Sequence, residues 1–276
     1  MSSIIEIKNN KKVTAKTAIK ELLKDKQVKL YKHPFSQTIN YSSCRFYVNG
    51  ESTRGITVDT EKDEITIRVN IMSSDEDLNL AVSISKTLSK LCKSEIRIEN
   101  EPVPIHYEDV ANGELKKTLF ENQMAGVALI KQMLEEGNPI EIPGLFAGFW
   151  PGTEYLEEKN LIAMHSKLML DFTALQNLES RGIRITNPIV TEKDGKQITF
   201  AVLSPNHQQL IPKCDSVVLA EVKPENFMAI PFEIFIENLG IEIYKVDAVQ
   251  LVFPALDRKE FRALMNRMKE FEVPII

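Results

Sequence analysis

The stretch Gly55-Ile-Thr-Val-Asp-Thr-Glu-Lys-Asp-Glu-Ile-Thr-Ile-Arg-Val-Asn-Ile71 decides the fold of the N-terminal part of the chain. Apolar residues alternate with polar ones in two runs, before and after the polar segment Thr60-Glu-Lys-Asp63. An alternating pattern is typical of a half-buried strand, and a short polar segment between two such runs is typical of a hairpin turn. The stretch therefore predicts an antiparallel hairpin.

The residues that follow the hairpin predict a well-capped helix. Ser74 stands where an N-cap residue would, and Asp77 lies three residues later, in the capping-box position. Asp75, Glu76 and Asp77 all lie near the positive end of the helix dipole. Apolar and small residues then recur every three or four positions as far as Cys92. This spacing predicts an amphipathic helix with Cys92 on its buried side.

The remaining pattern predicts an α+β fold. Helical spacing recurs near residues 114–136, 164–178 and 257–271, and a second hairpin joins 183–190 to 198–203 through the polar segment 191–196. Strands and helices do not alternate regularly, which disfavours a parallel α/β sheet. A length of 276 residues is comfortable for two domains. We expect two mixed subdomains, residues 1–137 and 161–276, each with a hairpin-based antiparallel sheet and amphipathic helices, joined by an irregular junction at 138–160.

Charge is distributed unevenly along an otherwise ordinary globular composition. Residues 1–100 carry 17 lysines and arginines against 13 acidic residues, whereas the rest of the chain carries 17 against 26, for a net charge of -5. The overall acidity argues against a nucleic-acid partner. Lys16, Lys20 and Lys24 would form one stripe on a helix. That stripe is either a solvated helix face, which we favour, or an anion-binding module.

Several classes of protein lack support in the sequence. The motifs GxGxxG, GxxxxGK[ST], GxSxG and HExxH do not occur, and the three cysteines include no CxxC pair. We therefore expect no cofactor and no metal site. No apolar stretch approaches the length of a membrane span, and no secretory signal is visible. These features together predict a soluble cytoplasmic protein.

Four residues are weak candidates for catalysis. His106 is followed closely by Glu108 and Asp109, which could orient its ring or join it at a metal ion. The same acids are equally consistent with the entry to a helix. Cys214 follows Lys213, a cation that would favour the thiolate, but no histidine base is tied to it by spacing. We expect neither constellation to be catalytic.

The segment Gly144-Leu-Phe-Ala-Gly-Phe-Trp-Pro-Gly152 has the most unusual composition. It contains three of the 11 glycines and the only tryptophan of the chain. An exposed loop carrying Phe146, Phe149 and Trp150 would suit a protein partner, because aromatic side chains supply large contact areas. The alternative, which we favour for the loop itself, is that these rings fill the junction between two subdomains.

Three segments resemble an arrangement found in uncharacterised bacterial domain families. They are Arg54-Gly-Ile-Thr-Val58, Ile65-Thr-Ile-Arg-Val-Asn-Ile71 and Ser73-Ser-Asp-Glu-Asp-Leu-Asn-Leu-Ala81. In those families a glycine-containing strand, a second strand and an acid-capped helix follow in this order. The resemblance implies a bacterial cytoplasmic protein. Some such relatives resemble parts of toxin–immunity or stress-response neighbourhoods, and the resemblance implies no catalytic residues.

The leading hypothesis is a non-enzymatic protein-binding protein of a regulatory, immunity-like kind. Its aromatic loop and the acidic, apolar surface of its C-terminal part would contact an unidentified protein partner. The alternative is a hydrolase or metal-dependent enzyme centred on His106, Glu108 and Asp109.

Overall fold

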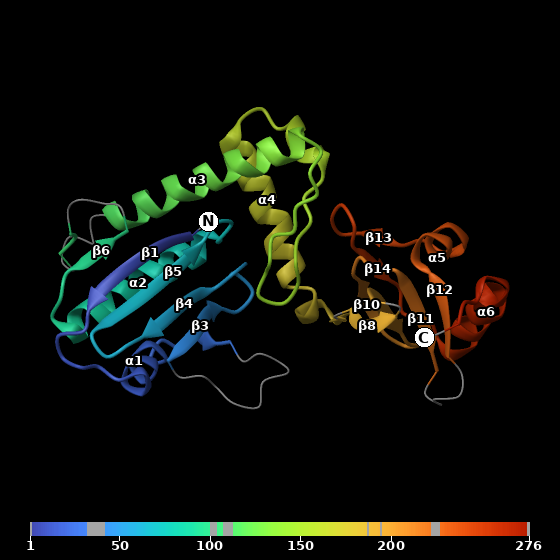
Figure 1. Ribbon diagram of the computed structural model, residues 1–276, viewed down its shortest axis with the longest axis horizontal. Helices are drawn as coiled ribbons and strands as arrows, with labels where there is room; N and C mark the ends of the chain where they lie inside the picture. The colour runs from blue at the N-terminus through green and yellow to red at the C-terminus, as the bar shows by residue number, and fades with distance from the viewer. Residues whose placement is uncertain are drawn as a thin grey trace. The chain divides into compact units, whose positions relative to one another are not determined.

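The computed structural model describes residues 2–31, 42–99, 104–106, 113–186, 188–193, 195–221 and 227–274. Within them the chain forms two compact units, Met1–Gln176 and Asn177–Ile276. Both units combine helices with sheets, one sheet wholly antiparallel and two mixed, which confirms the predicted α+β class. Figure 1 shows the elements of each unit.

The first unit is built on a six-stranded antiparallel sheet with strand order β2-β3-β4-β5-β1-β6. The bounds of its elements are β1 (Ser2–Lys8), α1 (Ala15–Leu22), β2 (Val28–Leu30), β3 (Ser43–Val48), β4 (Ile56–Thr60), β5 (Glu64–Asn70), α2 (Asp75–Cys92), β6 (Ile96–Ile98), α3 (Glu114–Glu135), the 3-10 helix η2 (Thr153–Glu157) and α4 (Leu161–Gln176).

The predicted hairpin and capped helix form the centre of this unit. Strands β4 and β5 pair antiparallel, and the side chain of Ser74 caps α2 in a capping box with Asp77. Ile65, Ile67 and Val69 of β5 are fully buried in the core beneath α2. The alternate residues of β5, which include Arg68 and Asn70, point to the opposite face of the sheet. Figure 1 shows α2 lying against one face of the strands.

Residues 138–160 belong to the first unit, and the chain passes into the second unit between Gln176 and Asn177. Helix α4 packs on α3 and η2 through buried side chains that include Met164, Leu168 and Phe172. The division of the chain into subdomains 1–137 and 161–276 with a junction at 138–160 stays a prediction.

The second unit contains two four-stranded sheets, with orders β13-β14-β10-β7 and β12-β11-β9-β8. Its elements are η3 (Glu179–Arg181), β7 (Ile183–Ile185), β8 (Ile189–Lys193), β9 (Lys196–Leu203), β10 (Gln208–Ile211), β11 (Ser216–Ala220), β12 (Phe227–Pro231), α5 (Phe232–Asn238), β13 (Tyr244–Lys245), β14 (Leu251–Phe253), α6 (Arg258–Met268) and η4 (Lys269–Phe271). Helices α5 and α6 bring Phe235 and Phe261 against Phe253 in the core.

The second hairpin differs from the sequence prediction in extent. The sequence predicts one strand over 183–190, but only β8 pairs antiparallel with β9. The first part of the predicted strand forms a separate strand, β7, in the other sheet. Strand β7 pairs parallel with β10, and β9 pairs parallel with β11. Parallel partners are distant in sequence, so local alternation carries no signal for them.

Candidate binding site

Asp77 of α2 fixes the loop between β3 and β4. Its buried carboxylate accepts hydrogen bonds from the backbone N–H groups of Thr53 (3.1 Å), Arg54 (3.0 Å), Gly55 (3.2 Å) and Ser74 (3.2 Å). Successive backbone N–H groups that converge in this way form an anion-binding concavity. The carboxylate of Asp77 occupies this concavity, so the loop between β3 and β4 is anchored to α2.

The anchored loop places two arginines side by side. Gly55 has φ +65°, and a Cβ there would stand 2.6 Å from the carbonyl oxygen of Phe46 and 3.3 Å from Cγ of Arg45, so the position requires glycine. Arg54 donates from Nη1 to the carbonyl oxygen of Ile71 at 3.0 Å. Burial and then the neighbouring charge of Arg45 lower the pKa of Arg54 to about 10, while Asp77 opposes the change. Arg54 is therefore still a cation at neutral pH.

The aromatic segment 144–150 forms a loop pinned to the first unit. Ile142 and Phe149 exchange backbone hydrogen bonds of 2.8 and 2.9 Å, and the N–H of Leu145 donates to the carbonyl oxygen of Thr53 at 2.9 Å. The buried amide of Gln176 accepts from the N–H of Phe146 at 2.7 Å and donates to the carbonyl oxygen of Ala147 at 2.8 Å. The backbone bonds of Ile142, Phe149 and Leu145, together with the side chain of Gln176, thus fix the loop.

The three aromatic residues of this loop have different surroundings. Phe149 is fully buried and stacks on Phe172 of α4 with ring centroids 5.1 Å apart. Phe146 and Trp150 are each partly exposed. Phe149 therefore belongs to the core of the first unit, and Phe146 belongs to its surface.

Phe146 completes a cluster that we call the aromatic–arginine surface, formed by Tyr31, Arg45, Tyr47 and Phe146. The ring centroid of Phe146 lies 6.0 Å from that of Tyr31 and 5.7 Å from that of Tyr47, and the two tyrosine rings are 6.4 Å apart. The guanidinium of Arg45 lies 5.8 Å from the ring centroid of Tyr31. All four side chains are partly exposed. The cluster joins the end of β2, the strand β3 and the aromatic loop.

A second feature, which we call the arginine cavity, lies in the same unit and has a volume of about 400 Å³. Its polar lining consists of Ser2, Arg54, Arg68, Asn70 and Glu141, and its apolar lining consists of Ile71, Leu129, Ile130, Met133, Ile140, Ile142 and Pro143. Ser2 and Asn70 are paired across β1 and β5. The carboxylate of Glu141 lies close to the backbone of Gly148.

The residues of the alternative, enzymatic hypothesis are only partly described. His106 is exposed and lines a cavity of about 520 Å³ with Lys90, Lys93, Ser94 and Glu95. Glu108 and Asp109 lie outside the described residues. Within the described part of the chain, no group of three or more His, Cys, Asp or Glu side chains could hold a metal ion.

The cysteines are buried in the structure. Cys44 lies in β3 and Cys92 on the inner side of α2, and burial raises the pKa of both thiols. Burial raises the pKa of Cys214 to about 11, against the opposing effect of a backbone hydrogen bond at Ala201. The thiolate that Lys213 was expected to favour is therefore a minor species at neutral pH, and a thiol in this state is a poor nucleophile.

The lysine stripe is exposed but does not lie wholly on a helix. Helix α1 ends at Leu22, so Lys16 and Lys20 lie on it and Lys24 lies beyond it. The ammonium of Lys24 pairs with Glu21 at 2.6 Å.

None of the described helices is long and apolar enough to span a membrane.

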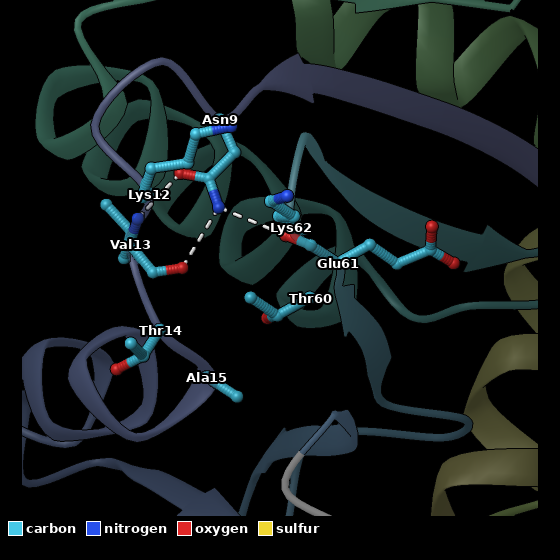
Figure 2. A pocket seen from close by; sticks show the side chains of 8 residues that line it. All are labelled: Asn9, Lys12, Val13, Thr14, Ala15, Thr60, Glu61 and Lys62. Carbon is cyan, nitrogen blue, oxygen red and sulfur yellow. Dashed lines mark hydrogen bonds between the residues drawn. The ribbon is translucent and has the colours of Figure 1, made fainter.

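A pocket of about 250 Å³ lies at the N-terminus of α1. Figure 2 shows the residues that line it. Asn9 lies at its wall, where its side-chain amide donates to the carbonyl oxygens of Val13 (3.0 Å) and Glu61 (3.1 Å). Lys12 forms an ion pair with Asp63. These bonds tie the loop after β1 to the turn between β4 and β5, and they indicate a structural role for the residues drawn.

His165 gives the first unit an expected pH dependence. Its ring is buried edge-on to Phe120, and burial lowers its pKa below the ordinary 6.5, with Asp75 opposing the change. The unfolded chain therefore binds a proton at a higher pH than the folded chain, and the free energy of unfolding falls as the pH drops below about 6.5. Urea denaturation at several pH values is expected to show that the free energy of unfolding falls less with decreasing pH in His165→Phe than in the wild type.

The exposed His207 supplies the control for this measurement. His207→Gln is expected to keep the wild-type decline of unfolding free energy with pH. Equal declines in His165→Phe and the wild type would show that His165 is not responsible.

Sequence reasoning identified Phe146 but missed the residues that it contacts. Tyr31, which follows β2, and Arg45 and Tyr47 of β3 are remote from Phe146 in sequence. Only the alternation of Arg45 with Tyr47 places those two on one face of a strand. In the sequence, Arg54 and Arg68 stand out only as parts of strand patterns. Gly55 beside Arg54 was the available signal for a tight loop.

A family model described as a domain of unknown function, DUF4299, matches residues 2–147. The matched segment includes the whole six-stranded sheet, and every residue of the aromatic–arginine surface and the arginine cavity falls within it. No curated protein and no solved structure matches the chain.

Proposed function

The chain belongs to the DUF4299 family, a domain of unknown function, and from the geometry of its first unit we propose that it is a non-enzymatic protein-binding protein of a regulatory, immunity-like kind. The observation that carries the proposal is the aromatic–arginine surface. Tyrosine, tryptophan and arginine are the residues that dominate the binding energy of protein interfaces. Here three aromatic rings and one guanidinium form a continuous, partly exposed cluster.

The cluster is held in place before a partner arrives. The N–H of Tyr31 donates to the carbonyl oxygen of Arg45 at 2.8 Å, and Tyr47 pairs with Lys29 across β2 and β3. Phe146 lies on a loop fixed by Gln176 and Thr53. A preorganised surface loses little conformational entropy when it binds, so more of the contact energy is available as affinity.

The charge of the surface selects the kind of partner. Among the described residues, no carboxylate lies within ion-pair distance of Arg45, although Arg54 lies close enough to interact with it electrostatically. A partner segment that carries a carboxylate beside apolar or aromatic side chains would pair with Arg45 and cover the three rings. We therefore propose an acidic, partly apolar segment of a protein as the occupant.

A selection from a random peptide library displayed on phage tests this proposal. The full chain is the bait, and the Tyr47→Ala/Phe146→Ala double variant is used for counter-selection. We expect the enriched peptides to carry Asp or Glu next to aromatic or aliphatic residues. Their affinity is expected to fall by about tenfold or more in Phe146→Ala and in Arg45→Gln, as for residues that dominate an interface.

Tyr244→Ala is the matched control, because Tyr244 is a tyrosine of the second unit that is 70% exposed. This variant is expected to bind the selected peptides as the wild type does. Selected peptides that bind Arg45→Gln and Phe146→Ala as tightly as the wild type would overturn the proposal, provided that circular dichroism shows all three chains folded.

A further inference from the structure

We propose that the arginine cavity is a binding site for a small amphipathic acid, that is, an anionic headgroup on an apolar chain. This site goes beyond the proposed protein-binding surface, since Tyr31, Arg45, Tyr47 and Phe146 do not line it. Its volume of about 400 Å³ falls in the range of small-molecule pockets, about 300–1,000 Å³.

The polar lining of the cavity suits an anion. Arg54 and Arg68 both line it, and among the described residues neither has a carboxylate within ion-pair distance. The guanidinium of Arg54 donates to one protein acceptor in the described structure, the carbonyl oxygen of Ile71. A guanidinium carries five N–H donors, so both arginines retain donors for a carboxylate or phosphate group. Ser2 and Asn70 add a hydroxyl and an amide.

The charge of the cavity is not balanced by its one acidic residue. Glu141 supplies one negative charge against the two positive charges of Arg54 and Arg68, and its carboxylate lies close to the backbone of Gly148. The nearby Arg45 adds further positive charge beside Arg54. Arg45 and Arg54 repel each other, and the buried carboxylate of Asp77 opposes this effect only in part. A bound anion would add negative charge beside Arg54, which gives the site a physical reason to favour a negatively charged ligand.

The apolar lining suits a hydrocarbon chain. Leu129, Ile130 and Met133 from α3 face the cavity together with Ile140, Ile142 and Pro143 from the segment that follows the helix. Apolar walls combined with a few polar groups that fix orientation are typical of ligand pockets. An acid with a very short chain would leave these walls exposed to water, so affinity is expected to rise with chain length.

Isothermal titration calorimetry with the full chain and five probes tests the site. Octanoate and octyl phosphate carry both required groups, acetate lacks the chain, octanol lacks the charge, and octyltrimethylammonium reverses it. We expect octanoate or octyl phosphate to bind at least about tenfold more tightly than each of the other three. The tighter of the two identifies the headgroup as a carboxylate or a phosphate monoester. Equal binding of octanol or octyltrimethylammonium would overturn the proposal.

Variants of exposed arginines on the same sheet locate the site. Arg68→Gln is expected to weaken binding of the preferred probe by about tenfold, because a charge-assisted hydrogen bond is lost. Arg97→Gln, on β6 and outside the cavity, is expected to bind as the wild type does. Unchanged binding in folded Arg68→Gln would overturn the proposal. Phe146→Ala should retain probe binding, so failure of the protein-binding proposal is distinguishable from failure of this one.

Discussion

Replacing Asp77 by Asn is expected to lower the free energy of unfolding of the first unit by about 1–3 kcal/mol, the usual cost of leaving a buried hydrogen-bond donor without its acceptor. The carboxylate accepts hydrogen bonds from four backbone N–H groups and is fully buried. An Asn side chain presents an NH₂ donor in place of one carboxylate oxygen, so at least one buried N–H group would face another donor. Urea denaturation followed by circular dichroism measures the loss.

Asp75→Asn is the matched control, because Asp75 lies in the same first turn of α2 but is exposed. Its replacement removes a favourable interaction with the helix dipole, together with a charge near His165, and should cost about 0.3–1 kcal/mol. If the two variants lost the same free energy of unfolding, the anchoring of the 53–55 loop by Asp77 would be wrong. The arrangement of Arg45 and Arg54 beside Gly55 would then lack its physical basis.

Replacing Phe149 by Ala is expected to cost about 3–5 kcal/mol of unfolding free energy, the usual result of truncating a buried phenylalanine. The ring of Phe149 is fully buried between Phe172 and Tyr155, with centroids 5.1 and 6.1 Å away. Phe146→Ala should lower the free energy of unfolding by less than about 2 kcal/mol, because Phe146 is partly exposed and buries less apolar surface.

This pair of variants separates the two interpretations of the aromatic loop. If Phe149 fills the core, Phe149→Ala loses stability, but the molecules that remain folded keep their affinity for the peptide. If Phe146 contacts a partner, Phe146→Ala keeps most of its stability and loses affinity for the peptide. Denaturation and peptide titration of both variants measure the two quantities. A large loss of stability in Phe146→Ala with unchanged peptide affinity would contradict the assignment of Phe146 to a binding surface.

The elements that were predicted correctly are those whose signals lie close together in the sequence. Alternation around Thr60–Asp63 predicts the β4–β5 hairpin, and Ser74 with Asp77 predicts the start of α2. The same kind of signal failed at residues 183–190, because local alternation continues while the chain moves from one sheet to another. Pairing between distant strands depends on tertiary packing, which propensity does not reveal.

The candidate site was predictable only in part for the same reason. The unusual composition around Phe146 drew attention to the loop, and the structure separates its aromatic residues into a buried Phe149 and a partly exposed Phe146. The contact of Phe146 with Tyr31 and Tyr47 depends on the folding of the whole first unit. Likewise, Arg54 and Arg68 meet in one cavity only because β5 and the loop fixed by Asp77 lie beside α3.

Hydrogen–deuterium exchange of the full chain with and without a selected peptide tests the central claim most directly. The peptide is predicted to slow exchange in residues 28–31, 43–48 and 145–147, which carry the aromatic–arginine surface. Exchange in the second unit, Asn177–Ile276, should not change. Protection confined to the second unit, or no protection at saturating peptide, would contradict the assignment of this surface as the protein-binding site.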